Sequence, residues 1–346
     1  MGRQRTSRFS LTVNILLPSP AVVFLLLINV YMTLCCLPLW AVHICFGKEP
    51  IMDPLSFTTV PTLNRPMLVL AFAGWNDAGG SATFAAKFLS QRLGANKFAS
   101  LDPETFYNFV EQRPQVRLRS GKREILWPAN EFSYARDSRL VQDVIIGLGV
   151  EPHLRWRSYI EAMLHVVQEC HVELVVTLGA LLADVAYSRP IRLTGTASDP
   201  ALARRLHLSM SRYEGPTGIV GTLGDAFRRQ GLPAISIWAN VPHYIAASPN
   251  IKAALALVRR VFTLLDFSAD LSDLETAASD FDRRVANVLA SDAKVSEYVR
   301  RLEERDEDDE EDEEYPGNTD ALPSGEELAR ELEEFLREQR RERGQE

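Results

Sequence analysis

Residues 67–80 are MLVLAFAGWNDAGG, and this stretch decides the fold. Its first seven residues are apolar, and a short apolar run that ends at a glycine is typical of a buried β-strand. Residues 81–93 follow with small and apolar side chains in a helical pattern. The polar residues 74–80 are therefore predicted to form the loop that joins a buried strand to a helix.

The same order of strand, polar loop and helix recurs along the chain. Such alternation predicts an α/β fold of three layers, with a mostly parallel sheet whose loops gather on one edge. A small hairpin, 116–119 with 124–127, is predicted at a sheet edge, and the helical pattern after residue 265 predicts a helical appendage. Strands are predicted at 67–73, 140–147, 172–178, 192–197 and 234–238, and helices at 81–93, 156–170, after the cap at 198–200, at 215–230 and at 250–265.

Charge is distributed unevenly along the chain. Residues 303–346 hold twenty acidic and six basic residues, a net −14, whereas the whole chain carries −8, so residues 1–302 carry +6. The globular part is thus only weakly basic, which argues against a nucleic-acid partner. The predicted segments are an apolar N-terminal segment at 1–51, an α/β core at 52–265, a helical appendage at 266–302, an acidic disordered linker at 303–323, and a short amphipathic helix with a tail at 324–346.

The N-terminal segment leaves two interpretations open. Residues 9–47 contain no Asp, Glu, Lys or Arg, and three arginines precede them. Residues 21–46 could be a single membrane-anchoring helix, or the natural start could lie near Met52, an alternative favoured by the prolines in the apolar span. Only Cys170 among the four cysteines lies in the core, which fits a reducing compartment. A cytoplasmic protein is expected, with a membrane-anchored one as the alternative.

Polar side chains gather in the loops that follow the predicted strands. In open α/β sheets, ligands bind in the crevice outside the carboxyl ends of the strands. Glu214 and His243, if adjacent, could act in general acid–base chemistry, and the amides of loop 215–218 could hold an anion. The candidate ligand-binding residues are Trp75, Asn76, Asp77, Glu151, Asp184, Glu214, Thr217 and His243, and His153 is a further acid–base candidate.

Each of these candidates also has a purely structural interpretation. Asp77 could cap the helix that follows it, Trp75 could lie in the core, and His243 could be a hydrogen-bonded loop residue. Loop 215–218 could pack tightly against the sheet. The sequence contains no nucleophile elbow, metal-ligand cluster or nucleotide-binding fingerprint. No catalytic residue, metal or cofactor is therefore predicted.

The C-terminal segment predicts a docking helix. Residues 324–327 fit a capping box, and the acidic residues 303–314 before them form a self-repelling tether. A short tethered amphipathic helix usually docks on something, which could be the protein's own core, another subunit or another protein. Its apolar stripe consists of Leu328, Leu332, Phe335 and Leu336.

A series of short motifs between residues 66 and 304 resembles the proteasome assembly chaperone 2 family, in its bacterial branch. The motifs occur in order along the chain. They are GWNDAG at 74–79, DPE with FY at 102–107, RP at 113–114, GVEP with RWR at 149–157, VTLGALLAD at 176–184, TGTASD at 194–199, RYEGPTGI at 212–219 and WANVPHY at 238–244.

The resemblance implies a three-layer α/β fold similar to phosphorylase and peptidyl-tRNA-hydrolase-like domains, assembled into oligomers. Eukaryotic and archaeal relatives chaperone the assembly of proteasome α-rings, and some dock through a C-terminal tail of a hydrophobic residue, a tyrosine and any residue. Residues 343–346 are RGQE, which does not match that tail. An oligomeric assembly or interaction protein is expected, with proteasome subunits among its protein partners. The alternative is a small-molecule-binding protein, or a hydrolase- or phosphorylase-like enzyme, that uses the candidate residues.

Overall fold

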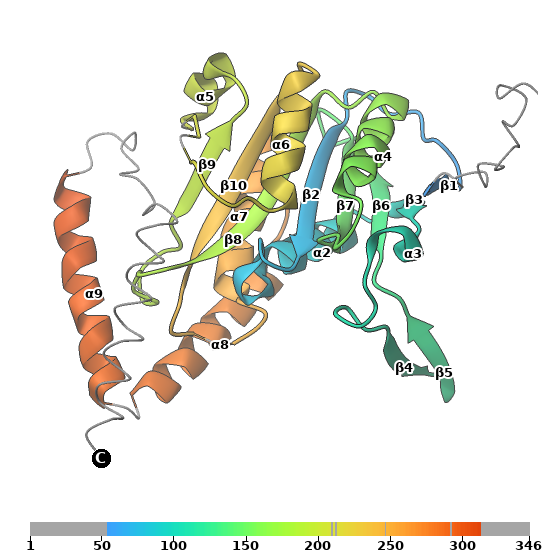
Figure 1. The fold of residues 1–346 in the computed structure, drawn as a ribbon. Helices are drawn as coiled ribbons and strands as arrows, with labels where there is room; N and C mark the ends of the chain where they lie inside the picture. Colours follow the sequence, from blue (N-terminus) through green and yellow to red (C-terminus); the bar gives the residue numbers. More distant parts are fainter. Residues whose placement is uncertain (1–53, 209, 212, 246, 291–292, 313–346) are drawn as a thin grey trace, which may run out of the picture. The chain divides into compact units, whose positions relative to one another are not determined.

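The computed structural model describes residues 54–312, except 209, 212, 246 and 291–292. These residues form an α/β fold around an eight-stranded sheet in the order β1-β3-β6-β7-β2-β8-β10-β9 (Figure 1), so the α/β part of the predicted fold class is confirmed. The strands are β1 (Leu55–Phe57), β2 (Met67–Ala73), β3 (Asn96–Leu101), β6 (Asn130–Ala135), β7 (Val144–Val150), β8 (Leu174–Ala183), β9 (Leu193–Ala197) and β10 (Ala234–Pro242).

The sheet has a parallel centre and antiparallel edges. β7, β2, β8 and β10 are neighbours and run parallel. β9 pairs antiparallel with β10, and β6, β3 and β1 continue antiparallel on the other side. The prediction of a mostly parallel sheet is therefore corrected to a mixed one. The missed strands mix polar with apolar residues, as in Asn96–Leu101, and lack the continuous apolar run of a strand buried on both faces.

Helices cover both faces of the sheet, which gives the three layers. The odd-numbered residues of β2, from Met67 to Ala71, pack in one core with the helices 81–92 and 251–264. The even-numbered residues, from Leu68 to Phe72, pack in a second core with the helices 156–169 and 219–229, because side chains alternate along a strand. The helices are η1 (Ala78–Gly80), α2 (Ser81–Arg92), α3 (Pro103–Phe106), α4 (Trp156–Glu169), α5 (Pro200–Leu206), α6 (Ile219–Arg229), α7 (Ile251–Leu264), α8 (Ser272–Leu289) and α9 (Ala293–Asp312).

β8 and β10 extend further than predicted. They stay paired in register as far as Ala183 and Pro242. In the sequence Gly179 suggests the end of a strand, but in the fold it makes room for an indole. A Cβ at Gly179 would lie 2.5 Å from Cε3 of Trp238 on the neighbouring strand. The loops after β8 and β10 therefore begin later than predicted.

The predicted hairpin forms a separate two-stranded sheet, β4 (Gln115–Arg119) and β5 (Lys122–Leu126). Ser120 and Gly121 between the strands have φ of 49° and 77°, as a tight hairpin turn requires. Figure 1 shows the hairpin drawn apart from the eight-stranded sheet. Every residue of the two strands is exposed except Leu126, which is half-buried.

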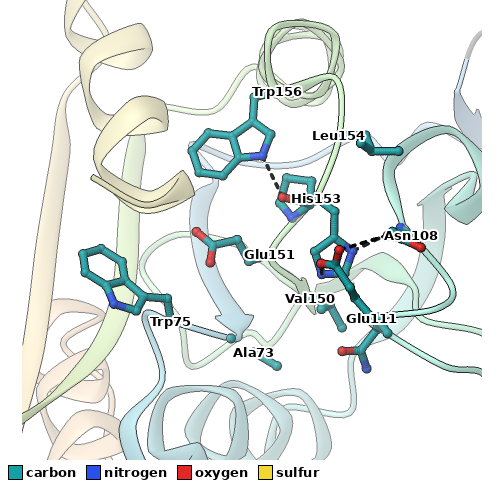
Figure 2. Close-up of a pocket in the computed structure, with 12 residues that line it drawn as sticks. Ala73, Trp75, Asn108, Glu111, Val150, Glu151, His153, Leu154 and Trp156 are labelled. Carbon is teal, nitrogen blue, oxygen red and sulfur yellow. Dashed lines mark hydrogen bonds and ion pairs between the residues drawn. The ribbon is translucent and has the colours of Figure 1, made fainter. Parts of the chain in front are cut away.

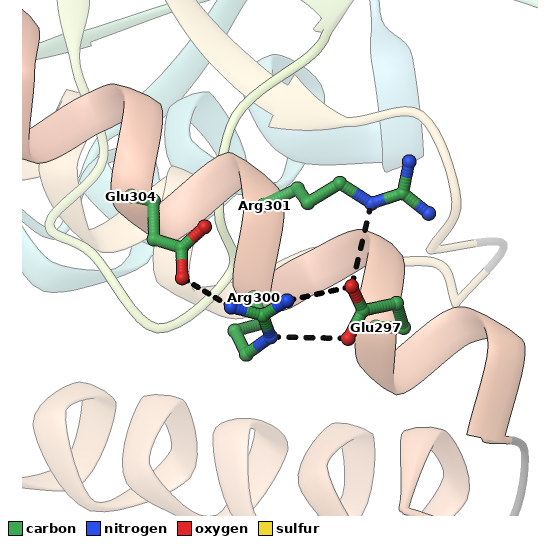
Figure 3. Close-up of polar contacts among 4 residues, drawn as sticks. All are labelled: Glu297, Arg300, Arg301 and Glu304. Atoms are coloured by element: carbon green, nitrogen blue, oxygen red, sulfur yellow. Dashed lines mark hydrogen bonds and ion pairs between the residues drawn. The ribbon is translucent and has the colours of Figure 1, made fainter.

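The helical appendage continues into the segment predicted to be a linker. In α9, Arg300 pairs with Glu297 at 2.6 Å and also with Glu304, and Glu297 lies 3.7 Å from Arg301 (Figure 3). Ion pairs three and four residues apart support a helix. The helix runs to Asp312, so the first part of predicted linker 303–323 is helical in the structure.

Several predictions concern residues that the structure does not describe. The apolar segment 1–51, the rest of the linker and the docking helix at 324–346 lie outside the described residues. Across residues 54–312, each described helix is too short or too polar to cross a membrane.

Candidate functional site

The loops after β2, β7, β8 and β10 lie along the carboxyl ends of the four parallel strands. Most of the candidate residues predicted from the sequence are in these loops or at the start of α6. Four of the candidates meet in two pairs. Asn76 and Glu151 meet at the start of α6, and Asp184 meets His243 beside Tyr298 of α9.

Glu151 joins the loops after β2 and β7 to the start of α6. Its Oε1 accepts hydrogen bonds from Asn76 Nδ2 at 3.0 Å and from Ile219 N at 2.7 Å. The carboxylate thereby meets the free amides and the positive end of the helix dipole. Gly218 permits this approach, since a Cβ there would lie 2.6 Å from Asn76 Oδ1. Glu151 is thus an N-terminal cap of α6.

Asp77 caps α2, as its structural interpretation expected. Its Oδ1 accepts from Ala82 N at 2.6 Å, and its Oδ2 accepts from Thr83 N at 3.3 Å and from the Thr83 hydroxyl. The carboxylate reaches across the single turn of η1 to do so. Burial raises the pKa of Asp77 above its usual value, while the hydrogen bonds from Thr83 and Ala82 act in the opposite direction.

Trp75 and Thr217 differ from Asp77 in being exposed. The Trp75 side chain is 69% exposed, so the alternative that it lies in the core is wrong. Its neighbour Asn76 is buried, so the loop turns the amide inward and leaves the indole outside. Thr217 lies against the first turn of α6, where a Cβ on Gly221 would be 2.0 Å from its hydroxyl oxygen.

His243 pairs with Asp184, which follows the neighbouring strand β8. His243 Nδ1 lies 2.9 Å from Asp184 Oδ1, and the Tyr298 hydroxyl of α9 donates to the same oxygen at 3.3 Å. Arg305 also donates to the Asp184 carbonyl. Glu214 is exposed in the loop before α6, and no contact joins it to His243 among the described residues. The acid–base pair considered from the sequence is Glu214 with His243. In the structure His243 pairs with Asp184 instead.

A cleft of about 400 Å³ opens beside Glu151 (Figure 2). It lies between the ends of β2 and β7, the start of α4 and the segment that follows α3. The sequence predicts part of this lining but not the residues that follow α3. The one feature of the sequence that could have pointed to them is the aromatic segment after residues 102–104. Its polar and aromatic lining includes Trp75, Glu151 and His153 from the candidates, and Asn108, Glu111 and Trp156 in addition.

A hydrogen bond to Nδ1 sets the tautomer of the neutral His153 ring in this cleft. Its Nδ1 accepts from the Asn108 backbone amide at 3.1 Å, so the neutral ring carries its proton on Nε2. Nε2 lies 3.9 Å from Glu111 Oε2, and Asn108 Nδ2 donates to Glu111 Oε1 at 2.9 Å. On the opposite side, the Trp156 indole donates to Pro152 O at 2.7 Å. These contacts hold the walls of the cleft in place.

Two buried phenols lie close to the cleft. The Tyr107 hydroxyl donates to Val150 O at 2.6 Å, and the Asn130 amide contacts that hydroxyl. Tyr159 is fully buried, and its hydroxyl has no hydrogen-bond partner among the described residues. Burial raises the pKa of both phenols above the usual value. Burial therefore favours the protonated form of both phenols.

The mixed sheet and the helices on both of its faces define an α/β protein. The described residues form no group of three or more potential metal ligands. The chain belongs to the PAC2 family, which matches residues 71–289. This confirms the resemblance found in the sequence motifs. Among curated proteins, none matches the chain.

Solved structures of related proteins support the assignment. A PAC2 family protein from Streptomyces avermitilis is 43% identical, with a TM-score of 0.63 over 68% of this chain and 99% of that one. A Mycobacterium tuberculosis protein described as a proteasome-assembly chaperone homologue is 40% identical, with a TM-score of 0.62 over 67% of this chain and 99% of that one. An archaeal proteasome activator from Pyrococcus furiosus is 22% identical, with a TM-score of 0.55 over 68% of this chain and 97% of that one, and so shares the fold.

Proposed function

We propose that this protein acts by binding other proteins, as an assembly factor of the proteasome-assembly-chaperone type, and that the β4–β5 hairpin is its contact surface. The M. tuberculosis relative at 40% identity, described as a proteasome-assembly chaperone homologue, supports the partner class. The exposed hairpin is the observation in this chain that carries the proposal. Proteasome subunits are the proposed partners.

One face of the hairpin is exposed and mostly apolar, with Arg123 opposite Leu118 as its one charged member. Val116 pairs with Ile125, and Leu118 lies two residues further along the same face. These side chains are 54%, 57% and 70% exposed, and Trp127 just beyond β5 is also exposed. An isolated hairpin is marginally stable, and clustered exposed apolar residues mark interaction surfaces. A partner that covers this face would stabilise it.

The charge of the hairpin indicates what kind of surface would cover it. The two strands and their turn contain one acidic residue, Glu124, and four basic residues, Arg117, Arg119, Lys122 and Arg123. The occupant that we propose is therefore an apolar surface with an acidic rim, because complementary charges steer encounter and fix orientation.

The contacts of the candidate ligand-binding residues support protein binding over the alternative of a hydrolase- or phosphorylase-like enzyme. Glu151 and Asp77 each cap a helix, and His243 is held between Asp184 and Tyr298. Side chains committed to such contacts are less available for proton transfer to a substrate. We further propose that the protein is a homo-oligomer and that the helix bearing Leu328, Leu332, Phe335 and Leu336 is a second docking element.

Co-purification from the native host tests the proposal. Tagged wild-type protein is expected to recover proteasome subunits, whereas Leu118→Glu recovers much less. Val141→Glu is the matched control, since Val141 is 62% exposed but lies in the turn before β7, outside the hairpin. Failure to recover proteasome subunits, with unchanged proteasome assembly after deletion of the gene, would refute the proposed partner. Equal recovery by wild type and Leu118→Glu would refute the proposed surface.

A further inference from the structure

We propose that the cleft beside Glu151 binds a cationic group, a guanidinium or an ammonium. No residue of the β4–β5 hairpin lines this cleft, so binding here does not depend on the proposed function. The group could belong to a lysine or arginine side chain of a protein, or to a small free amine. Both sources share the chemistry that the cleft would recognise.

The cleft has a negative lining. Glu151 and Glu111 are both in its wall, and none of its lining residues is a lysine or arginine. The Asn108 amide donates to His153 Nδ1, so this ring nitrogen acts as an acceptor in the wall of the cleft. Glu151 is half-buried, so solvent screens its charge less than it would on an open surface, and the exposed carboxylate of Glu111 adds a second, more strongly screened attraction for a cation.

Glu151 keeps capacity for a ligand after capping α6. A carboxylate has about four acceptor positions, and Oε1 uses two of them, for Asn76 and Ile219. Oε2 accepts no hydrogen bond from the described residues. It lies 3.4 Å from the place where a Cβ on Gly74 would stand, and Gly74 itself lines the cleft. The side chain is therefore held in position by one oxygen and can offer the other to a donor.

Two indoles accompany this carboxylate. Figure 2 shows the Glu151 carboxylate pointing toward the side on which Trp75 and Trp156 lie. The Trp156 ring is fixed through its N–H to Pro152 O, whereas Trp75 is 69% exposed. One exposed tryptophan is ordinary, but indoles beside a carboxylate in a cleft are suited to cations, which bind to the faces of aromatic rings. A ligand here would cover Trp75.

The volume suits a side chain or a small molecule. Ligand pockets commonly measure about 300 to 1,000 Å³, and this cleft of about 400 Å³ lies at the lower end. A neutral group of the same shape would gain neither the attraction to the carboxylates nor that to the ring faces. Recognition should thus depend on the positive charge of the ligand. A pair of probes that have the same shape but differ in charge can test this.

Titration of the full-length protein tests the proposal. The probes are N-acetyl-arginine amide and its neutral analogue N-acetyl-citrulline amide, followed by the indole N–H signals in NMR. Binding of the arginine probe alone is expected, with affinity falling as salt increases. Glu151→Gln should weaken binding about tenfold, Glu111→Gln about threefold and Trp75→Leu about threefold.

Glu173→Gln is the matched control, because Glu173 precedes β8 at the opposite end of the sheet and should leave binding unchanged. If Glu151→Gln disturbs α6, the Glu111 and Trp75 variants still decide the matter, since neither side chain caps a helix. Equal binding of both probes, or full affinity in the Glu111→Gln and Trp75→Leu variants, would overturn the proposal.

A second titration distinguishes the two sources of the cation. Tighter binding of an Ala-Arg-Ala amide than of agmatine supports a side chain presented by a protein. The reverse order supports a small free amine. Binding of neither probe overturns the proposal.

Discussion

Asp77 allows the most detailed stability prediction, because its carboxylate accepts three hydrogen bonds from the first turn of α2. In Asp77→Ala the amide of Ala82, which is buried, and the amide and hydroxyl of Thr83 lose their acceptor. Loss of a helix cap costs about 1 kcal/mol, and an unpaired buried donor about 1 to 3 kcal/mol more. The free energy of unfolding should therefore fall by about 2 to 4 kcal/mol.

Thermal and denaturant unfolding of the full-length protein measure this loss. The thermal midpoint should fall by about 5 to 10 °C in a chain of this size. Asp102→Ala is the control, because Asp102 caps the four-residue helix α3 at the surface and its loss should cost less than about 1 kcal/mol. A change below about 0.5 kcal/mol for Asp77→Ala would refute the assignment of Asp77 as a cap.

The pH dependence of the Asp77 contribution has a defined sign. Burial raises the folded-state pKa of this carboxyl above its usual value. The folded state therefore holds its proton to higher pH, and the stability contributed by Asp77 decreases as pH rises from the unfolded value through the folded one. Asp77→Asn keeps an acceptor for Ala82 N but cannot titrate. Relative to this variant, wild type should lose stability over that window, and a constant difference would contradict the raised pKa.

Three further predictions concern groups that the fold buries or crowds. Gly218→Ala would place a Cβ 2.6 Å from Asn76 Oδ1 and 2.8 Å from Glu151 Oε1. Denaturant unfolding should therefore show a free energy of unfolding lower by about 1 to 3 kcal/mol, and an unchanged midpoint would contradict this close approach. Tyr159→Phe removes a buried hydroxyl that has no partner among the described residues, so stability should stay within about 1 kcal/mol of wild type or rise, whereas a large loss would reveal a missed hydrogen bond. Burial raises the pKa of Cys170 to about 11, so peptide mapping should find this thiol unmodified by iodoacetamide at about pH 8 in the folded protein and modified after unfolding.

The centre of the sheet was predictable because its strands are buried on both faces. β2 has the predicted bounds, since its first six residues, 67–72, each pack in one core or the other and must be apolar. The edge strands β1, β3 and β6 carry no such pattern. They depend on pairing with distant residues, as between Asn96–Leu101 and Asn130–Ala135, which a local pattern does not reveal.

The candidate site was predictable only in part for the same reason. Strand order placed Asn76 and Glu151 together, because β2 and β7 are neighbours. Asn108 and Glu111 come from an irregular segment after α3, and no periodic signal links that segment to β7. The pairing of His243 with Asp184 follows from the extra length of β8 and β10, which depends on how Gly179 accommodates the indole of Trp238.

Quantitative recovery of partners through the hairpin tests the central claim most directly. Tagged wild-type, Leu118→Glu and Val141→Glu proteins would be isolated from the native host at equal expression, and the bound proteasome subunits measured by mass spectrometry. We expect wild type and Val141→Glu to recover equal amounts and Leu118→Glu to recover at least about tenfold less, as for loss of an apolar contact at the centre of an interface. Equal recovery by all three proteins would contradict the account.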